Sequence, residues 1–218
     1  MCGSYGLGGY LHPGEGPADA LPPLDQREQA RVIAEWAREW GGKASTSRER
    51  RDGRVNLHPL IVPVGAERGL VLAWWWLHVG GEPAPFTAFN SRDDALMRRW
   101  RAPFQRRALI PADWYSEGGK TWRLPSGEQF GIAAITSPRM VGGEELVSYS
   151  MVTRHGIGEA STVVSSRGES RMPLVLPREL HDEWLDPDRP GDAELVALVQ
   201  DASEGISREL TADEGALF

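Results

Sequence analysis

Hydrophobic side chains recur at helical spacing in one stretch near the start of the chain. Arginine and glutamate residues separate them, so one face of this segment is apolar and the other is charged. Asp25 is a suitable N-cap for a helix that runs to Trp40. Shorter amphipathic patterns predict helices from Ser91 to Trp100 and from Asp192 to Gln200. The apolar positions of the first helix are Val32, Ile33, Trp36, Ala37 and Trp40.

The middle of the chain consists of short runs rich in β-branched and aromatic residues, which predict strands. No regular alternation of strand and helix runs through this region, so repeated strand-helix-strand units are absent. The order favours an α+β fold with a mixed, barrel-like antiparallel sheet and flanking helices. The predicted strands are Val55–Val64, Leu70–Leu77, Arg107–Pro111, Thr121–Leu124, Gln129–Thr136, Leu146–Val152 and Pro173–Leu176.

Length and composition are those of one globular domain. The chain has 218 residues, of which 40% are hydrophobic and 25% are charged, and this balance excludes a chain that is disordered throughout. No apolar run is long enough to span a membrane, and the N-terminus lacks the features of a signal peptide. We therefore expect a cytoplasmic protein.

Several common kinds of active site are missing from the sequence. A single cysteine excludes a disulfide framework and a zinc site built from several cysteines. The glycines of residues 6–9 lack the spacing of a phosphate loop, and no Gly-x-Ser-x-Gly motif marks a serine hydrolase. The five histidines show no metal-ligand spacing, and we interpret His58, beside Pro59, as a structural histidine with a hydrogen bond. We expect no metal and no cofactor.

The negative charge is concentrated at the C-terminus. Residues 178–218 hold 12 acidic and 3 basic side chains, a charge of −9, whereas the preceding residues carry about +2. We therefore divide the chain into a body, residues 2–185, and an acidic C-terminal helix and tail, residues 186–218. The tail could shield a binding surface or contact a basic partner.

Two clusters of basic residues in the body could follow a phosphate backbone. The alternative is a solvated charged surface, which is the common role of such runs. The first cluster is Lys43, Arg48, Arg50, Arg51 and Arg54, and the second is Arg92, Arg98, Arg99, Arg101, Arg106 and Arg107.

The only cysteine is Cys2, directly after the initiator methionine. Removal of Met1 would place an α-amine, with a reference pKa of about 7.7 to 8.0, beside a thiol with a reference pKa of about 8.5. Together they can trap an aldehyde, because the amine condenses to a Schiff base and the thiol then closes a thiazolidine ring. The alternative is a small, inert thiol at the chain start.

Five short segments occur in a fixed order along the chain. They are Met1-Cys2-Gly3, Arg54–Pro59, Phe89–Arg92, Arg106–Asp113 followed by Tyr115 and Glu117, and Ser170–Leu176. In order and spacing they resemble the SRAP family, the SOS-response-associated peptidases, over most of residues 2–185. The resemblance implies a SRAP-like fold. It also implies covalent cross-linking to abasic sites in single-stranded DNA through the N-terminal cysteine.

The resemblance implies roles for four of these residues. Cys2 would be the nucleophile, exposed by autoproteolysis or by an aminopeptidase. Asn90 would hold the cysteine amine and the sugar oxygen, and Glu117 would move protons while the closed deoxyribose opens to its aldehyde. Arg92 would bind a phosphate with its guanidinium fork. By local sequence alone, Asn90 could equally form a turn, and Glu117 could be an ordinary loop residue.

Further DNA contacts are expected from arginine and tryptophan side chains. Arg99 and Arg101 belong to the second basic cluster, and Arg171 lies in the last of the five segments. Trp74 and Trp75 lie in a predicted strand, where successive side chains point to opposite faces, so that one indole could stack on a base. Packing in the core is the alternative for at least one of them.

Three positions depart from the family pattern. Most members have a histidine where this chain has Glu169, an arginine where it has Ser4, and a tryptophan where it has Gly118. Glu169 is a candidate catalytic residue because a glutamate with a raised pKa can transfer protons, but an ionised one would repel phosphate. His155 could take its place.

The leading hypothesis is therefore a DNA-repair enzyme of the SOS response with lyase-type cross-linking activity and autopeptidase (hydrolase) activity. Its expected partner is single-stranded DNA that contains abasic sites; we expect a monomer, associated with the nucleoid when bound to DNA and not with a membrane. Two alternatives stay open. One is a single-stranded DNA-binding module that has lost the chemistry, and the other is a thiol-dependent peptidase whose main target is its own N-terminus.

Overall fold

Five long strands form a closed, barrel-like sheet in the computed structural model, which describes residues 3–10, 17, 19–46, 57–141, 144–165 and 168–213. The sheet order β12-β4-β3-β8-β11 closes because β11 also pairs with β12. This architecture confirms the expected α+β fold with a barrel-like sheet. The strands are β3 (Leu57–Val64), β4 (Glu67–Trp74), β8 (Arg107–Ala112), β11 (Phe130–Val141) and β12 (Glu144–His155).

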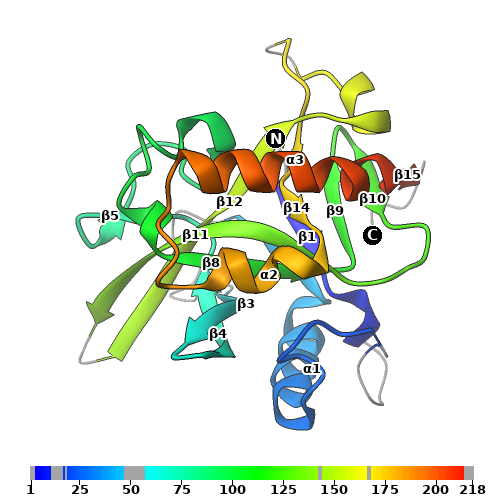
Figure 1. Ribbon diagram of the computed structural model, residues 1–218. Coiled ribbons are helices and arrows are strands. Elements are labelled where there is room, and N and C mark those ends of the chain that lie inside the picture. Colours follow the sequence, from blue (N-terminus) through cyan, green and yellow to red (C-terminus); the bar gives the residue numbers. More distant parts are fainter. Residues whose placement is uncertain are drawn as a thin grey trace.

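A second, antiparallel sheet has five strands and packs beside the barrel (Figure 1). The two glycines at positions 118 and 119 have φ angles of 63° and 77°, which is the geometry of a tight hairpin turn between β9 and β10. The sheet order is β15 (Thr211–Asp213), β10 (Lys120–Arg123), β9 (Trp114–Glu117), β1 (Ser4–Gly6) and β2 (Lys43–Ser45).

Short elements complete the fold at the edges of the two sheets. β5 (His78–Val79) and β6 (Glu82–Pro83) form a small hairpin, β13 (Arg171–Pro173) extends the barrel sheet beside β12, and β14 (Val175–Leu176) pairs with β11. β7 (Asn90–Arg92) pairs in parallel with β12. The 3-10 helices are η1 (Gly8–Tyr10), η2 (Asp93–Ala95), η3 (Pro103–Gln105), η4 (Gly158–Thr162) and η5 (Arg178–Leu180).

Three α-helices flank the sheets (Figure 1). They are α1 (Arg27–Trp40), α2 (His181–Leu185) and α3 (Ala193–Glu209). α1 buries Ile33, Trp36 and Ala37, as its pattern predicts, and ends at Gly41 in a left-handed conformation. Asp25 is not its cap, because Gln26 holds that position without a side-chain hydrogen bond. Asp192 does cap α3, since its carboxylate accepts a hydrogen bond from the Leu195 N–H at 2.9 Å.

The helix predicted from Ser91 to Trp100 is wrong. Asn90–Arg92 is the strand β7, followed by the single 3-10 turn η2. The Ser91 side chain does not cap a helix, because its hydroxyl hydrogen-bonds the Ser150 hydroxyl at 2.7 Å in the barrel. The tertiary partner β12 therefore overrides the local helical spacing.

The acidic tail packs into the fold. α3 buries Leu195 and Val199, and β15 adds the edge strand to the five-stranded sheet. The side chain of Arg154 on β12 donates a hydrogen bond to the Gln200 carbonyl at 2.7 Å. Residues 186–213 thus share the core with the body. No helix in the described ranges is long and apolar enough to cross a membrane.

Candidate functional site

Five of the predicted site residues line one groove of about 650 Å³. The groove lies where β7, η2, β13 and the end of β12 meet, and Asn90, Arg92, Arg99, Glu169 and Arg171 all contribute to its wall. The sequence motifs that carry these residues are therefore assembled in one place by the parallel pairing of β7 with β12 and the antiparallel pairing of β13 with β12. The other lining residues are Phe86, Thr87, Ala95, Trp100, Thr153 and Ser165.

Arg92 is held between two carboxylates. Its Nε and Nη2 donate to the two oxygens of Asp94 at 2.9 and 2.7 Å, and its Nη1 donates to both oxygens of Glu169 at 3.2 Å. The Arg92 guanidinium, through hydrogen bonding and charge, lowers the pKa of Asp94, and the Asp94 hydrogen bond raises the pKa of Arg92. The sequence shows Asp94 only as an acid two residues after an arginine, whereas the ion pair with Glu169 depends on the fold.

Arg171 is fixed in the groove wall from behind. Its Nη2 donates to the carbonyl and hydroxyl oxygens of Thr153 at 2.6 and 3.0 Å and lies 3.5 Å from a carboxylate oxygen of Asp93. The other oxygen of Asp93 accepts a hydrogen bond from the side chain of Gln200 on α3 at 2.7 Å. The acidic tail thus supports the groove through Gln200, a contact that no local sequence signal predicts.

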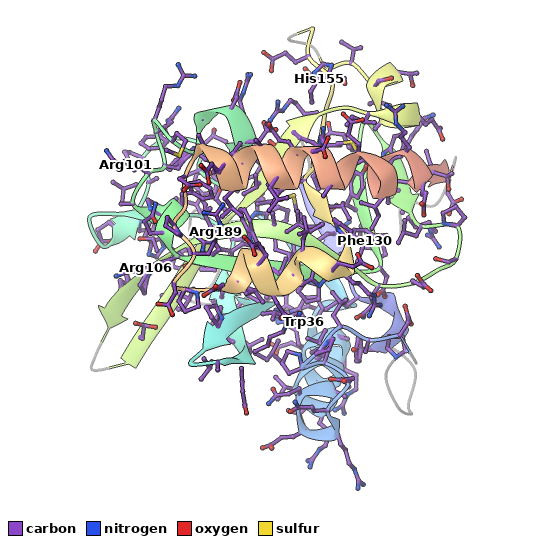
Figure 2. All side chains as sticks on the ribbon, in the orientation of Figure 1. Trp36, Arg101, Arg106, Phe130, His155 and Arg189 are labelled. Atoms are coloured by element: carbon purple, nitrogen blue, oxygen red, sulfur yellow. The ribbon has the colours of Figure 1, made fainter. Side chains whose placement is uncertain are left out.

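Arg99 stacks on aromatic rings at the edge of the groove. Its guanidinium carbon lies 4.6 Å from the ring centre of Phe86 and 5.1 Å from that of Trp100. Arg101 is exposed but is not among the residues that line the groove. Figure 2 shows Arg101 and Arg106 at the same lateral edge of the molecule, near the β5–β6 hairpin.

Trp74 and Trp75, one of which was expected to stack on a base, are both buried. Trp75 is fully buried, its indole N–H donates to the Phe89 carbonyl at 2.8 Å, and its ring stacks on Tyr149. Trp74 is 5% exposed and packs its ring edge-on against His78. The expected contact of Trp74 or Trp75 with a base is therefore wrong, because both indoles are buried by neighbouring side chains.

Arg107 is a structural residue although it belongs to the second basic cluster. It is 4% exposed, and its guanidinium donates hydrogen bonds to four backbone carbonyls, three of them at or after the end of α2 and one on η3. Burial lowers its pKa. It cannot follow a phosphate backbone. In the first cluster, Arg48, Arg50, Arg51 and Arg54 lie outside the described residues.

Glu117 lies on β9, next to the strand that leads from the N-terminus. It is 9% exposed, and the register places Ser4 of β1 opposite Ser116, one residue before Glu117. Glu117 is not among the residues that line the groove. Cys2 lies outside the described residues, so its predicted role stays a prediction.

A buried hydrogen-bond chain joins β1 to the barrel. The Tyr5 and Tyr149 hydroxyls are 2.5 Å apart, and the Tyr149 hydroxyl is 2.8 Å from Nδ1 of His58. The Ser45 N–H approaches the other nitrogen of His58 at 3.4 Å. Burial lowers the pKa of His58 to about 3. His58 is therefore the structural histidine that its sequence context predicted.

His155 does not take the place of Glu169 in the groove. It is the last residue of β12, is exposed, and lies at the top of the molecule in Figure 2. Its backbone pairs with that of Arg171, but its side chain is not among the groove-lining residues. Among the described residues, no group of three or more His, Asp or Glu side chains has the arrangement of a metal site.

Gly118 has no room for the tryptophan expected at this position. A Cβ atom there would lie 2.1 Å from a methyl carbon of Val163, and the backbone has a φ of +63°. Val163, at the end of η4, therefore occupies the volume beside the β9–β10 turn. The packing of Val163 against this turn therefore accommodates glycine at position 118 and no larger residue.

We expect Gly118→Ala to destabilise the protein by about 1 kcal/mol from the left-handed backbone and by a further 1 to 3 kcal/mol, roughly, from the overlap with Val163. Gly119→Ala is the matched control, because its φ is +77° and nothing lies within 4 Å of its Cβ position. Urea unfolding of both variants measures the difference. Equal losses would contradict a packing conflict at Gly118.

The comparisons with known proteins agree with this fold. A structure of a protein from Bordetella bronchiseptica has a TM-score of 0.65 and 18% identity, and the match covers 99% of this chain and 100% of that one. A protein from Bacteroides thetaiotaomicron has a TM-score of 0.53 and 19% identity over 72% of each chain. No curated protein sequence matches. The family model described as SOS response associated peptidase (SRAP) matches residues 34–212, and this chain therefore belongs to the SRAP family.

Proposed function

We propose that this protein cross-links to abasic sites in single-stranded DNA through Cys2. The observation that most supports the proposal is the groove, where Asn90, Arg92 and Arg171 lie together in a chain of this family. Guanidinium groups bind phosphate, and an amide can both donate and accept hydrogen bonds without titrating. Arg92 and Arg171 would hold the DNA backbone, and Asn90 would orient the cysteine amine and the sugar.

The chemistry needs only the protein and the aldehyde, and it releases one water molecule. The Cys2 amine attacks the aldehyde carbon and releases one water molecule, which leaves an imine. The thiol sulfur then bonds to the imine carbon, and the thiol proton passes to the nitrogen, which closes the thiazolidine ring. Glu117 would supply the general acid-base catalysis that opens the closed sugar to its aldehyde.

The test is incubation of the full chain with a single-stranded oligonucleotide that carries one abasic site. We expect a heat-stable band on a denaturing gel, with the intact mass of the protein without Met1 plus the oligonucleotide minus one water. An oligonucleotide with a tetrahydrofuran analogue is the control, because it has no aldehyde and should give no band.

The Cys2→Ala variant distinguishes the role of the thiol from that of the α-amine, because it removes the thiol and keeps the amine. It should give no stable adduct, whereas borohydride should still trap its imine because the α-amine remains. A heat-stable adduct of Cys2→Ala without reductant, or an adduct that retains Met1, would reject the thiazolidine mechanism.

A DNA-binding module without the chemistry is the second candidate. Two observations favour it: the Glu169 carboxylate contacts Arg92 inside the groove, and Val163 fills the space beside Gly118. In that case the protein would bind intact single strands and form no adduct in the assay above. Its affinity for single-stranded DNA would be the same in the Cys2→Ala variant.

A further inference from the structure

The two carboxylates on Arg92 occupy different sides of its guanidinium. Asp94 takes the edge formed by Nε and Nη2 in a two-bond fork and is not among the groove-lining residues. Glu169 takes Nη1 and does line the groove. Asp94, which is 50% exposed, therefore orients the guanidinium from outside the groove, while Glu169 covers the edge that a ligand in the groove would meet.

The Arg92–Glu169 contact is accessible to solvent and can be exchanged. The side chains of Arg92 and Glu169 are 48% and 52% exposed, and the bonds between them are longer than those to Asp94. An ion pair of this exposure contributes little to stability, so a phosphate can displace it. The Arg171–Asp93 pair differs, since its side chains are only 12% and 8% exposed and are fixed by the groove wall.

We propose that Glu169 is a specificity-determining residue that competes with DNA phosphate for Arg92. The proposal rests on the proposed binding of single-stranded DNA in this groove. Each phosphate that an arginine neutralises releases counterions and adds to the affinity for any strand, whatever its sequence or damage. By occupying Arg92, Glu169 removes one such contact and weakens the binding of intact strands.

The covalent adduct depends less on the contact between Arg92 and a phosphate than the non-covalent binding of intact strands does. Once a bond to Cys2 forms, the adduct is held by that bond and not by the phosphate contacts. Lower affinity for intact DNA therefore increases the preference for strands that carry an aldehyde. Arg99, which has no ion pair among the described residues and stacks on Phe86 and Trp100, remains available to a phosphate.

The test is the affinity of Glu169→Gln for an intact single-stranded oligonucleotide, measured by fluorescence anisotropy at several salt concentrations. The substitution keeps the shape of the side chain and removes its charge. We expect the affinity to rise about fivefold. The slope of log affinity against log salt should become steeper by about 0.7, because one more phosphate contact forms.

Two variants with the same loss of charge serve as controls. Asp94→Asn should give no gain in affinity, because Arg92 loses the fork that orients it. Glu35→Gln, on the exposed side of α1, should also leave binding unchanged; in Figure 1, α1 lies at the opposite end of the molecule from the yellow segment that contains Glu169. Thermal melting of each variant confirms that it is folded.

The outcomes separate this proposal from the proposed function. Equal gains for Glu169→Gln and Asp94→Asn would mean a general effect of charge and would reject competition at Arg92, as would an unchanged salt slope for Glu169→Gln. A wild-type protein that forms the abasic-site adduct keeps the proposed function whatever Glu169→Gln does. If neither the wild type nor Glu169→Gln binds single-stranded DNA or forms an adduct, both proposals fail.

Discussion

Acidification from pH 6.5 to pH 4.5 is expected to destabilise the protein by roughly 6 to 7 kcal/mol, since each histidine kept neutral by the fold costs up to about 1.4 kcal/mol per pH unit below its unfolded pKa. Three histidines meet this condition. His58, His78 and His181 are each 1% exposed. Burial lowers the pKa of His58 to about 3 and those of His78 and His181 to about 4, from the usual 6.5.

Acid lowers the stability because the folded and unfolded states bind different numbers of protons. Below pH 6.5 the unfolded chain takes up protons on these histidines while the folded protein does not, so acid favours the unfolded state down to the folded pKa values. Asp113 opposes this trend, because burial raises its pKa and the folded state binds its proton first. One carboxyl group offsets only part of the effect of three imidazoles.

The free energy of unfolding in urea, measured at several pH values between 4.5 and 7, checks this expectation. His58→Gln should reduce the slope against pH by about a third, because the amide can still hydrogen-bond Tyr149 and does not titrate in this range. His155→Gln is the control, since His155 is exposed and outside the core. A slope that stays unchanged in His58→Gln would show that this histidine is not buried in the neutral form.

Arg107→Leu is expected to cost about 4 kcal/mol, because it leaves buried carbonyl groups without their hydrogen-bond donor. The guanidinium donates to the carbonyls of Trp184, Asp186 and Arg189 at 2.6 to 2.7 Å and to that of Phe104 at 3.1 Å. These bonds fix the end of α2 and the segment that leads to α3. Their loss should loosen the tail as well as lower the stability.

Thermal unfolding measures the effect, which corresponds to a fall in melting temperature of roughly 8 to 16 °C for a domain of this size. Arg107→Lys keeps the charge but cannot supply the fork of donors, so it should recover less than half of the loss. Arg106→Ala is the matched control, because the neighbouring side chain is exposed and its loss should stay within about 0.5 kcal/mol. Similar losses for Arg106→Ala and Arg107→Leu would contradict the structural role.

The sequence predicts the elements whose periodicity is long and regular. The apolar spacing around Trp36 predicts α1, and runs of β-branched residues predict the strands of the barrel, because each pattern has one way to bury its apolar face. β11 and β12 are longer than predicted, since their ends continue as a paired hairpin. β1, β2 and β9 have three or four residues each, which is too short for a period to be visible.

The chemistry of the site is partly visible in the sequence as well. The segments that resemble the SRAP family contain Asn90, Arg92 and Arg171, and Glu169 stands where most members have a histidine; these four residues do line one groove. Their residue types and order are local properties that a chain carries whatever its fold. Cys2 is also marked by its position in the sequence alone.

Only the tertiary structure decides which charged and aromatic side chains are available. Arg107 and Arg92 belong to the same basic cluster, yet one is buried among carbonyls and the other is exposed between two carboxylates. Trp75 is enclosed by residues far away in the sequence, and Glu169 meets Arg92 across 77 positions. Sequence fixes the identity and spacing of side chains, whereas burial and ion pairing depend on which distant segments the fold brings together.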